Sequence, residues 1–397
     1  MQTPDADRFD ENGADGSDGG DGGEDAPDGG FARGDAADGR GGDGRRGDDG
    51  FGPEDDRSER ERDDDRFGRR EDFEKGTAPY RRELLTHCYR MVGSVHEAED
   101  LVQDTMLRAW LAYDRYDAAR ASLRTWLYRI ATNRCLTALR GRTRRPLPSG
   151  LVGALEDPGA PMALAAEVPW LEPFPDRGTA GTAFGAGAAA GDPAGVVAAR
   201  GSLRLALIAA MQLLPPRQRA VLILRDVLAW PAAEVAEALG TSTASVNSAL
   251  QRARARLGEA GLTEEEVTEP PDPGQRVVID RYLRAFEDAD LDALRALLTR
   301  DVVLEMPPVL NWYVGPDAYV AFIARVFAMR GTDWRLRPTS ANGQPALAAY
   351  VRAPGDDTHR LHTLQVFTAE HGAVSHTVVF QLPSVFAAFG LPETWEE

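Results

Sequence analysis

Apolar residues recur at helical spacing between Leu214 and Leu257 and predict three short helices in succession. Two stripes mark the first two helices: Ala220, Leu222, Ile223, Val227 and Leu228, then Val235, Ala236 and Leu239. Pro231 suits a first helical turn, Gly240 supplies a left-handed stop, and residues 241–243 offer hydroxyl caps. The turn between the last two helices is therefore about three or four residues long, as a helix-turn-helix requires.

The third predicted helix has one apolar and one polar face. Its inward residues are Val246, Leu250, Ala253 and Leu257. The polar residues that remain for water or DNA are Ser245, Asn247, Ser248, Gln251, Arg252, Arg254 and Arg256. Amide and hydroxyl groups can read base edges in the major groove, and guanidinium groups can contact phosphates. The alternative is a three-helix bundle with a solvated basic face, but the tight turn beside a polar face favours DNA binding.

A second helical region is predicted from Tyr80 to Arg145. Its most regular inward stripe is Ala98, Leu101, Val102, Thr105, Met106, Ala109 and Trp110, and acidic or amide side chains surround it. After Asp117 the charge reverses, with eight arginines and no acid up to Arg145, interleaved with Trp126 and Tyr128. Arginines neutralise phosphates and aromatic rings stack on unpaired bases, although each tryptophan is equally well explained as a core residue. This region suits a nucleic acid on one side and a basic protein on the other.

These two regions carry a family resemblance. YRRELLTHCYRMVGSVHEAEDLVQDTMLRAW followed by SLRTWLYRIATNRCLTALR resembles region 2 of the extracytoplasmic-function (ECF) group of sigma-70 factors. Leu203 to Leu257 resembles region 4 of the same group, and the two regions occur in the same order as in that group. The resemblance implies a non-enzymatic promoter-specificity subunit of bacterial RNA polymerase.

The resemblance also implies roles for individual residues. The polymerase-binding residues, which would dock on the clamp coiled coil of the largest subunit, are Glu99, Asp100, Leu101, Gln103 and Asp104. The residues that would open and read the minus-ten element are Arg124, Trp126, Arg129, Asn133 and Arg134, with a flipped base captured by the loop 117–122. The residues that match positions reading the minus-35 element are Ser245, Asn247, Ser248, Gln251 and Arg252, with Arg254 and Arg256 expected on phosphates. Region 4 would also contact the polymerase flap. Family members often carry basic residues where Asn247 and Ala249 stand, which predicts weaker affinity or a different promoter sequence.

Composition agrees with a globular protein that works in the cytoplasm. No run of about eighteen apolar residues and no signal peptide is visible, so we expect no membrane span and a cytosolic location. Cys88 and Cys135 lie on apolar helical faces without CxxC spacing, so we expect buried reduced thiols, no metal site and no cofactor.

Residues 1–73 are predicted to be a disordered acidic tail. Residues 1–70 hold 23 acids against 11 arginines, which accounts for about 12 of the chain's net charge of -18. With almost no aliphatic residues, this tail cannot bury enough surface to offset its ordering entropy. It masks the basic face of residues 74–146 electrostatically, only solubilises the chain, or reflects a mis-assigned start codon.

A Gly-, Ala- and Pro-rich stretch, residues 147–200, is predicted to be a flexible acidic linker between region 2 (74–146) and region 4 (201–262). The resemblance implies that it threads the basic cleft of the polymerase. Its apolar knot around Trp170 is expected to dock on the polymerase or on the chain's own C-terminal domain.

The last segment, 275–397, is predicted to be a separate α+β cone. Helical stripes run through 277–286 and 291–298, and strands are expected over 302–306, 334–338, 346–352, 359–368 and 374–381 in a curved antiparallel sheet. The element order and the helix GPDAYVAFIARVF resemble the SnoaL-like group, known as a fusion to actinobacterial sigma factors. Cones of this type enclose a pocket, for which the candidate lining residues are Glu305, Trp312, Tyr313, Asp317, His362, Gln365 and His376.

Three function classes remain open from the sequence. The first is a sigma factor whose C-terminal domain regulates its activity. The second is a bifunctional regulator whose cone binds or converts a small metabolite as ligand, although no nucleophile and base stand at a defensible spacing. The third is a conventional repressor, which has no use for the acidic helix around Asp100.

Overall fold

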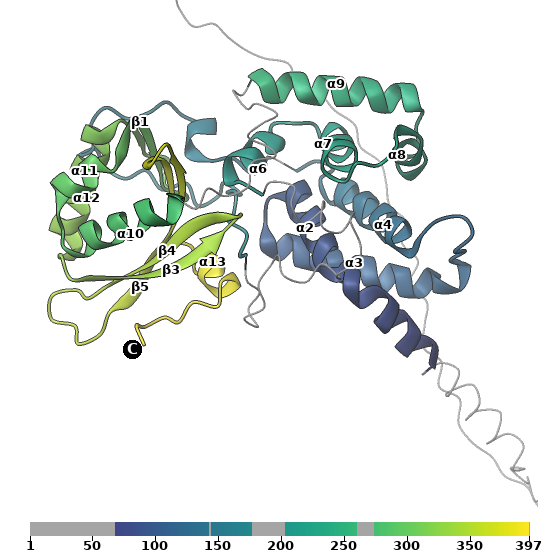
Figure 1. Ribbon diagram of the computed structural model, residues 1–397, viewed down its shortest axis with the longest axis horizontal. Helices are drawn as coiled ribbons and strands as arrows, with labels where there is room; N and C mark the ends of the chain where they lie inside the picture. The colour runs from purple at the N-terminus through teal and green to yellow at the C-terminus, as the bar shows by residue number, and fades with distance from the viewer. Residues whose placement is uncertain (1–67, 143, 177–202, 260–273, 397) are drawn as a thin grey trace, which may run out of the picture. The chain divides into compact units, whose positions relative to one another are not determined.

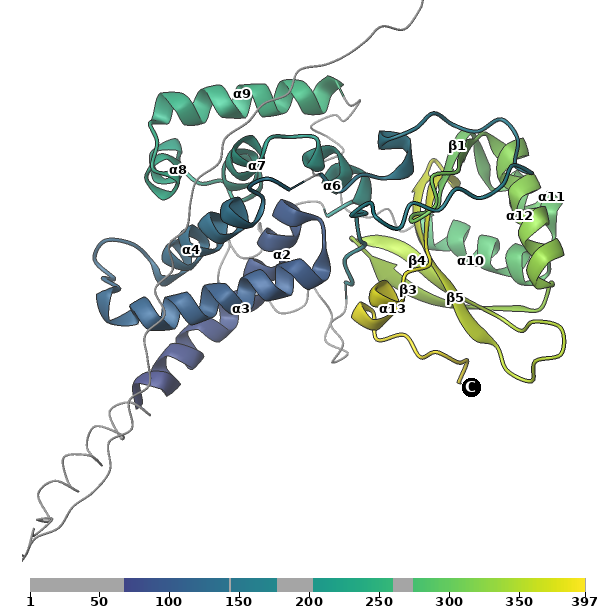
Figure 2. The same ribbon diagram turned by 180° about the vertical axis from the view of Figure 1, so that it is seen from behind.

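The computed structural model describes residues 68–142, 144–176, 203–259 and 274–396, so the predicted acidic tail up to residue 67 lies outside the described residues (Figures 1 and 2). The described ranges form two helical domains and an α+β domain. We call residues 68–142 the first helical domain, 203–259 the second helical domain and 274–396 the cone. None of the helices in these ranges combines the length and apolar character that a membrane crossing requires.

The first helical domain packs three main helices around one apolar interior. After a helical stretch over residues 68–77, its elements are η1 (Ala78–Tyr80), α2 (Arg81–Val92), α3 (Val95–Ala112), η2 (Tyr113–Arg115) and α4 (Leu123–Ala138). Gly93 ends α2 in the left-handed conformation, and Ser94 starts α3 by accepting a hydrogen bond from the Glu97 amide. The predicted inward stripe of α3 is buried, apart from a half-buried Trp110.

The second helical domain is the helix-turn-helix that the sequence predicts. Its elements are α6 (Leu205–Gln212), α7 (Pro216–Leu222), the π-helical turn η4 (Ile223–Val227), α8 (Ala232–Leu239) and α9 (Thr243–Glu259). Gly240 ends α8 with a φ of 61°, and the Ser242 hydroxyl accepts from the Ser245 amide at 3.2 Å. All four predicted inward residues of α9 are buried.

The cone wraps helices against one six-stranded sheet with the order β2-β1-β6-β5-β4-β3. Its elements are α10 (Gly274–Glu287), α11 (Leu291–Ala296), β1 (Leu298–Glu305), β2 (Trp312–Val314), α12 (Pro316–Arg330), β3 (Trp334–Ala341), β4 (Gln344–Val351), β5 (Arg360–Glu370), β6 (Ala373–Phe380) and α13 (Pro383–Ala388).

Three details of the cone differ from the sequence prediction. The sheet is mixed because β1 pairs with β6 in parallel, whereas we predicted an antiparallel sheet. The short elements β2 and α13 were not predicted, since three and six residues are too few to establish a period. Val277, placed in the apolar stripe of α10, is exposed instead.

Residues 147–176, predicted as part of a flexible linker, lie along the cone beside β1 and α12 (Figure 2). We call this segment, which includes η3 (Pro148–Gly150), the strap. Its amides and carbonyls are bonded to the cone: Leu155 donates to the Trp312 carbonyl at 2.9 Å, and the Arg325 guanidinium donates to the carbonyls of Pro158 and Ala160. These partners are more than 150 residues away in sequence, so local composition gives no sign of them. The remaining linker residues, 177–200, lie outside the described residues.

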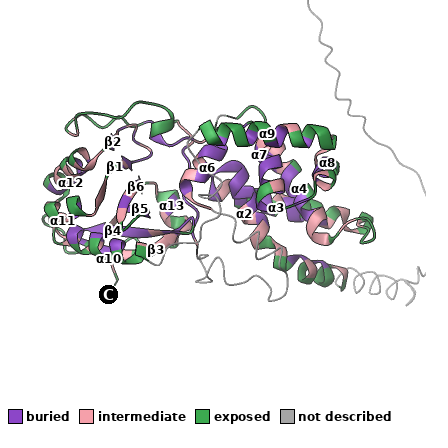
Figure 3. Cartoon of the chain, turned by 45° about the horizontal axis from the view of Figure 1, so that its top comes forward, coloured by how far each residue is buried: buried purple, intermediate pink, exposed green. Residues whose placement is uncertain are grey.

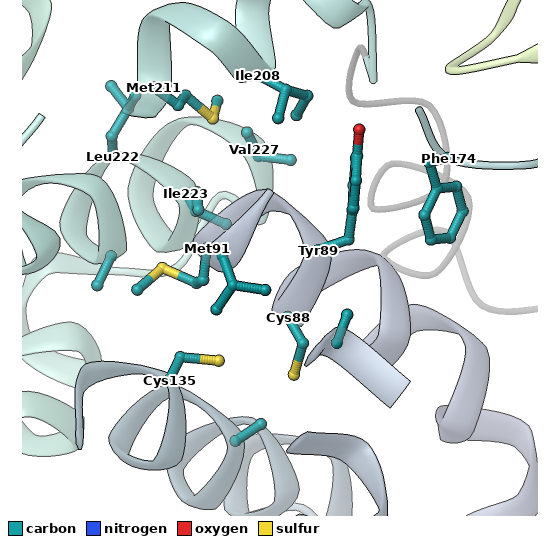
Figure 4. Close-up of a cluster of buried hydrophobic side chains, with 14 of the residues drawn as sticks. Cys88, Tyr89, Met91, Cys135, Phe174, Ile208, Met211, Leu222, Ile223 and Val227 are labelled. Atoms are coloured by element: carbon teal, nitrogen blue, oxygen red, sulfur yellow. The ribbon is translucent and has the colours of Figure 1, made fainter. Parts of the chain in front are cut away.

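One apolar cluster connects the helical domains, the strap and one face of the cone sheet. Figure 4 shows Met91 beside Ile223, and Tyr89 between Ile208 of the second helical domain and Phe174 of the strap. Cys88 and Cys135 lie in the same cluster as free thiols, as predicted. A hydrogen bond to Cys135, followed by burial, raises the pKa of Cys88, which keeps this thiol protonated at neutral pH.

Candidate nucleic-acid interface

The outer face of α9 carries the polar residues that the sequence assigns to DNA reading. Ser245, Asn247, Gln251 and Arg252 are exposed, and Ser248 is half-buried. Figure 3 shows exposed segments along α9. The Arg252 guanidinium donates to the Ser248 hydroxyl at 2.5 Å, which orders two neighbouring side chains on this face. The arrangement offers amide, hydroxyl and guanidinium groups on one helix, the combination that reads base edges in the major groove.

The two further arginines of α9 differ in their surroundings. Arg254 makes two 2.9 Å bonds to the carboxylate of Asp226 at the end of η4. Such a two-pronged pair fixes the arginine side chain but offsets part of its charge. Arg256 is exposed on the same helix.

Helix α4 holds the five residues predicted to handle the minus-ten element. Arg124 is paired with Glu83 of α2 at 3.0 Å and lies over the Tyr128 ring, and Arg134 is paired with Asp104 of α3. Trp126 packs against Tyr116 with ring centroids 5.1 Å apart. Arg129 and Asn133 are exposed. The structure therefore brings all five onto one helix, and of these only Arg129 and Asn133 are exposed.

Two acidic residues of α8 lie against this same surface of α4. Glu234 accepts a 2.9 Å hydrogen bond from the Thr125 hydroxyl, and Glu237 lies 3.6 Å from the Arg129 guanidinium. The Tyr128 and Trp230 rings meet edge to face behind these contacts, at 5.8 Å. In this arrangement the second helical domain covers part of the face that the sequence assigns to DNA.

A stripe on α3 carries the predicted polymerase-binding residues. Glu99, Asp100 and Gln103 are exposed and Asp104 is half-buried, whereas Leu101 is only 8% exposed and belongs to the core. The apolar side chains exposed on this helix are Leu107 and Leu111, at 57% and 72%. These two leucines lie one helical turn apart and form a small exposed apolar patch on α3.

The hairpin between β3 and β4 contacts three other parts of the chain. Asn342 and Gly343 have φ values of 58° and 69°, the two left-handed residues of a type I′ turn. The Asn342 side chain accepts from the Phe174 amide at 2.7 Å, and its amide group donates to the Tyr89 hydroxyl at 2.9 Å and to the Leu203 carbonyl at 2.7 Å. One buried side chain thus joins the cone, the strap and both helical domains.

Arg219 makes a second buried connection between the helical domains. Its guanidinium donates to the Met91 carbonyl at the end of α2 and to the Gln212 and Leu214 carbonyls around the end of α6. Burial lowers the pKa of Arg219 to about 10, so the side chain stays charged at neutral pH. Because one guanidinium donates to carbonyl oxygens of both helical domains, these hydrogen bonds connect the two domains.

The candidate pocket residues of the cone separate into two groups. His362 and Gln365 line a cavity inside the cone. Glu305 instead accepts hydrogen bonds from the Ser149 amide and hydroxyl at 3.0 Å, and these bonds hold the start of the strap on the cone. The Glu305 carboxylate also lies 3.1 Å from His376 Nε2. Trp312 donates to the strap at Val152, Tyr313 stacks on Phe322, and Asp317 pairs with Arg295.

Sequence reasoning missed several residues of these surfaces. The Asn342-Gly343 pair between two strands is a recognisable hairpin signal, but nothing local shows that its side chain bonds three other segments. In the sequence, Glu234 and Glu237 look like ordinary solvent-exposed acids on the first helix of a helix-turn-helix. Leu107 and Leu111 follow Gln103 at intervals of four residues and so continue the predicted polymerase-binding face of α3. Extending the helical pattern beyond Asp104 would have identified them.

Comparisons with known proteins fit this architecture. The Sigma-70 region 2 family matches residues 78–145, the Sigma-70 region 4 family matches 204–257, and the SnoaL-like domain family matches 279–377. The ECF RNA polymerase sigma factor SigG of Mycobacterium tuberculosis is 50% identical over 328 residues, covering 82% of this chain and 85% of its own length. SigJ of the same organism is 32% identical over 290 residues, 70% of this chain and 81% of SigJ.

A solved structure shows the same fold. The crystal structure of the Mycobacterium tuberculosis extracytoplasmic function sigma factor SigJ superposes with a TM-score of 0.53 and 26% identity, covering 79% of this chain and 97% of that chain. With a relative 50% identical over most of both lengths, the chain belongs to the ECF RNA polymerase sigma factors, the subunits that direct RNA polymerase to promoters, and it carries a C-terminal SnoaL-like domain.

Proposed function

We propose that the second helical domain (region 4) reads the minus-35 element through α9, and that the first helical domain (region 2) opens and reads the minus-ten element through α4. The observation that carries this proposal is the exposed polar face of α9, with Asn247, Gln251 and Arg252 side by side on a helix-turn-helix. On α4, Arg129 and Asn133 make first contact, and Trp126 supplies a ring for an unstacked base.

We further propose that α3 docks on the clamp coiled coil of the largest polymerase subunit. Asp100 and Gln103 offer acidic and amide contacts to a basic surface, and the exposed Leu107 and Leu111 supply the apolar part of the contact. The predicted flap contact belongs to region 4.

The compact arrangement supports a role for the cone in regulation. The two promoter elements lie about 25 base pairs apart, which is about 85 Å of duplex at ~3.4 Å per base pair. Because α4 and α8 are in direct contact, regions 2 and 4 must separate before both elements are bound. We call the arrangement in which α4 contacts α8 the closed state. Asn342 forms hydrogen bonds to both regions and to the strap, so the cone stabilises the closed state and lowers activity.

Run-off transcription with bacterial core polymerase tests the promoter and polymerase roles. Arg252→Ala should cost about 1–3 kcal/mol of promoter binding, because a guanidinium contact to a base edge or phosphate is lost. Asp100→Arg should abolish product by reversing the charge at the clamp contact. The matched controls are Arg281→Ala and Asp288→Arg, exposed on or just after α10 in the cone. Loss of product with the controls as well, or retention with both test variants, would contradict these roles.

Asn342→Gly tests regulation by the cone. Glycine keeps the left-handed turn but removes the side chain that makes three hydrogen bonds, each worth about 0.5–1.5 kcal/mol. We expect more run-off product at limiting sigma factor. The control is His371→Gly, which changes the same type of position in the exposed hairpin between β5 and β6, where φ is 50°. Equal product from both variants would exclude this regulatory contact.

A further inference from the structure

The cone contains a cavity of about 100 Å³ between α10, α12 and the sheet. Most of its wall is apolar and includes Phe286, Phe322, Ile323, Trp334 and Val379. An apolar cavity of about 150 Å³ takes up one benzene molecule, whereas sites for drug-sized ligands measure roughly 300–1,000 Å³. The cavity is smaller than the one that takes up benzene, so it admits a single ring only when a flexible lining residue such as Met162 moves aside, and it excludes a fused multi-ring molecule.

The exposed lining residues mark where the cavity opens. Met329 and Arg330 at the end of α12 are exposed, and so is Gln381, just after β6. The strap contributes Met162 to the same lining. Methionine is flexible and packs well on rings, so Met162 can move to admit a ligand and then cover it.

A bulge in β5 determines which polar groups face the cavity. Ala349 pairs with Thr363 and Tyr350 with Leu361, so His362 is the extra residue of the strand. As a result His362, Thr363 and Gln365 all line the cavity, although strict alternation would turn His362 outward. Burial lowers the pKa of His362 to about 4, with a smaller contribution from Arg330, so the imidazole is neutral at pH 7.

Gln365 has an open hydrogen-bond acceptor. It is 5% exposed, its amide group donates weakly to Thr363 at 3.4 Å, and its Oε1 has no partner among the described residues. The other polar groups deep in this lining are paired: the Tyr282 and Tyr319 hydroxyls lie 2.8 Å apart, and Tyr319 donates to Thr377 at 3.0 Å. A buried carbonyl oxygen without a donor costs about 1–3 kcal/mol, so the vacant acceptor favours a ligand that brings an O–H group.

We propose that this cavity binds a small, uncharged, single-ring molecule with one hydroxyl group, whose O–H donates to Gln365 Oε1 while Met162 of the strap covers the ring. Binding itself is independent of the regulatory role argued above. Only its consequence, tighter docking of the strap and a more stable closed state, rests on that proposed function.

A ligand-observed NMR titration of the full chain with phenol, toluene and benzoate tests the proposal. Phenol should bind saturably and roughly tenfold more tightly than toluene, because only phenol donates a hydrogen bond. Gln365→Leu should bring phenol and toluene to equal affinity, and the retained toluene binding shows that the cone is folded. Gln275→Leu, outside the cavity lining on α10, should keep the preference for phenol.

Two further measurements locate the ligand and define its class. Ile323→Trp should abolish binding of both rings by filling the cavity, whereas Val277→Trp on the exposed side of α10 should not. Absence of saturable phenol binding, an unchanged phenol preference in Gln365→Leu, or benzoate binding more tightly than phenol through Arg330 would each overturn the proposal. Because all three readouts measure binding, they are unaffected by any failure of the transcription experiments.

Discussion

His87 is a neutral imidazole buried between α2 and α4. Its Nε2 lies 2.9 Å from the Thr132 hydroxyl, and its ring meets Tyr128 edge to face at 5.1 Å. Burial is the main reason that its pKa falls to about 3, and the positive charges of Arg90 and Arg124 lower it further. The residue that anchors this helix pair is therefore also an acid-sensitive point of the fold.

The depressed pKa of His87 predicts how stability depends on pH. Between about pH 6.5, the unfolded value, and pH 3, the unfolded chain binds a proton that the folded chain does not. The free energy of unfolding should therefore fall as pH drops through this window, by up to about 1.4 kcal/mol per pH unit from this group. In urea unfolding between pH 4 and 6, His87→Asn should show a shallower slope by that amount. His371→Asn, at an exposed turn that asparagine tolerates, should keep the wild-type slope. Identical slopes for the two variants would exclude His87 as the source.

Helices α4 and α8 meet through a hydrogen bond and an ion pair. Glu234 contacts Thr125 and Glu237 contacts Arg129 in the closed state, so under the proposed function the fraction of molecules with an open α4 limits the apparent DNA affinity. The contact is partly exposed and each pair contributes only about 0.2–1 kcal/mol, which keeps the closed state reversible.

Removing both acids should favour the open α4. We expect Glu234→Ala with Glu237→Ala to raise affinity for single-stranded minus-ten DNA about fivefold, which corresponds to roughly 1 kcal/mol. Fluorescence anisotropy measures this affinity, with a single strand that carries the minus-ten element of a promoter transcribed in the run-off experiment. A gain that survives in 0.5 M salt reports opening, whereas a gain that disappears there reports only a change in local charge. Asp288→Ala with Glu370→Ala removes two exposed charges from the cone and should leave affinity unchanged.

An element can be predicted from the sequence when the residues that determine its structure lie close together in the chain. Helix α9 was predicted with its correct inward face because Val246, Leu250 and Ala253 form a local period that tertiary packing preserves. The docking of the strap on the cone was not predicted. Its hydrogen bonds join Leu155 to Trp312 and Ser149 to Glu305, and no local pattern encodes pairs so distant in sequence. The orientation of His362 depends on a bulge against β4, so alternation along β5 alone was insufficient.

For the whole molecule, the closed state is one cluster of buried side chains drawn from all three domains and the strap. Under the proposed function, initiation at a promoter requires this cluster to divide, because α4 and α9 would have to reach elements far apart on the duplex. The net negative charge of the chain sets no obstacle, since most of it belongs to residues 1–70. Whether those residues mask region 2 stays a hypothesis, which promoter affinity of a chain without them would decide.

A reversible crosslink between the two regions should switch transcription off. Thr125→Cys with Glu234→Cys places two thiols where side chains now bond at 2.9 Å, within reach of a short bis-maleimide that contains a cleavable disulfide. Native Cys88 and Cys135 are buried and should react slowly. We expect the crosslinked chain to give no run-off product and to recover after reduction. The single Glu234→Cys variant, treated in the same way, is the control. Undiminished product from the crosslinked chain would show that initiation does not need the regions to separate.

Docking of the strap also shortens the chain between regions 2 and 4. Residues 147–176 are 30 residues, and an extended chain covers about 3.3–3.6 Å per residue, so a fully extended strap spans up to about 100 Å. That length is comparable to the spacing between the two promoter elements. If the regions separate as proposed, release of the strap from the cone lengthens the connection between them, and the part that stays docked limits the promoter spacer that they can bridge.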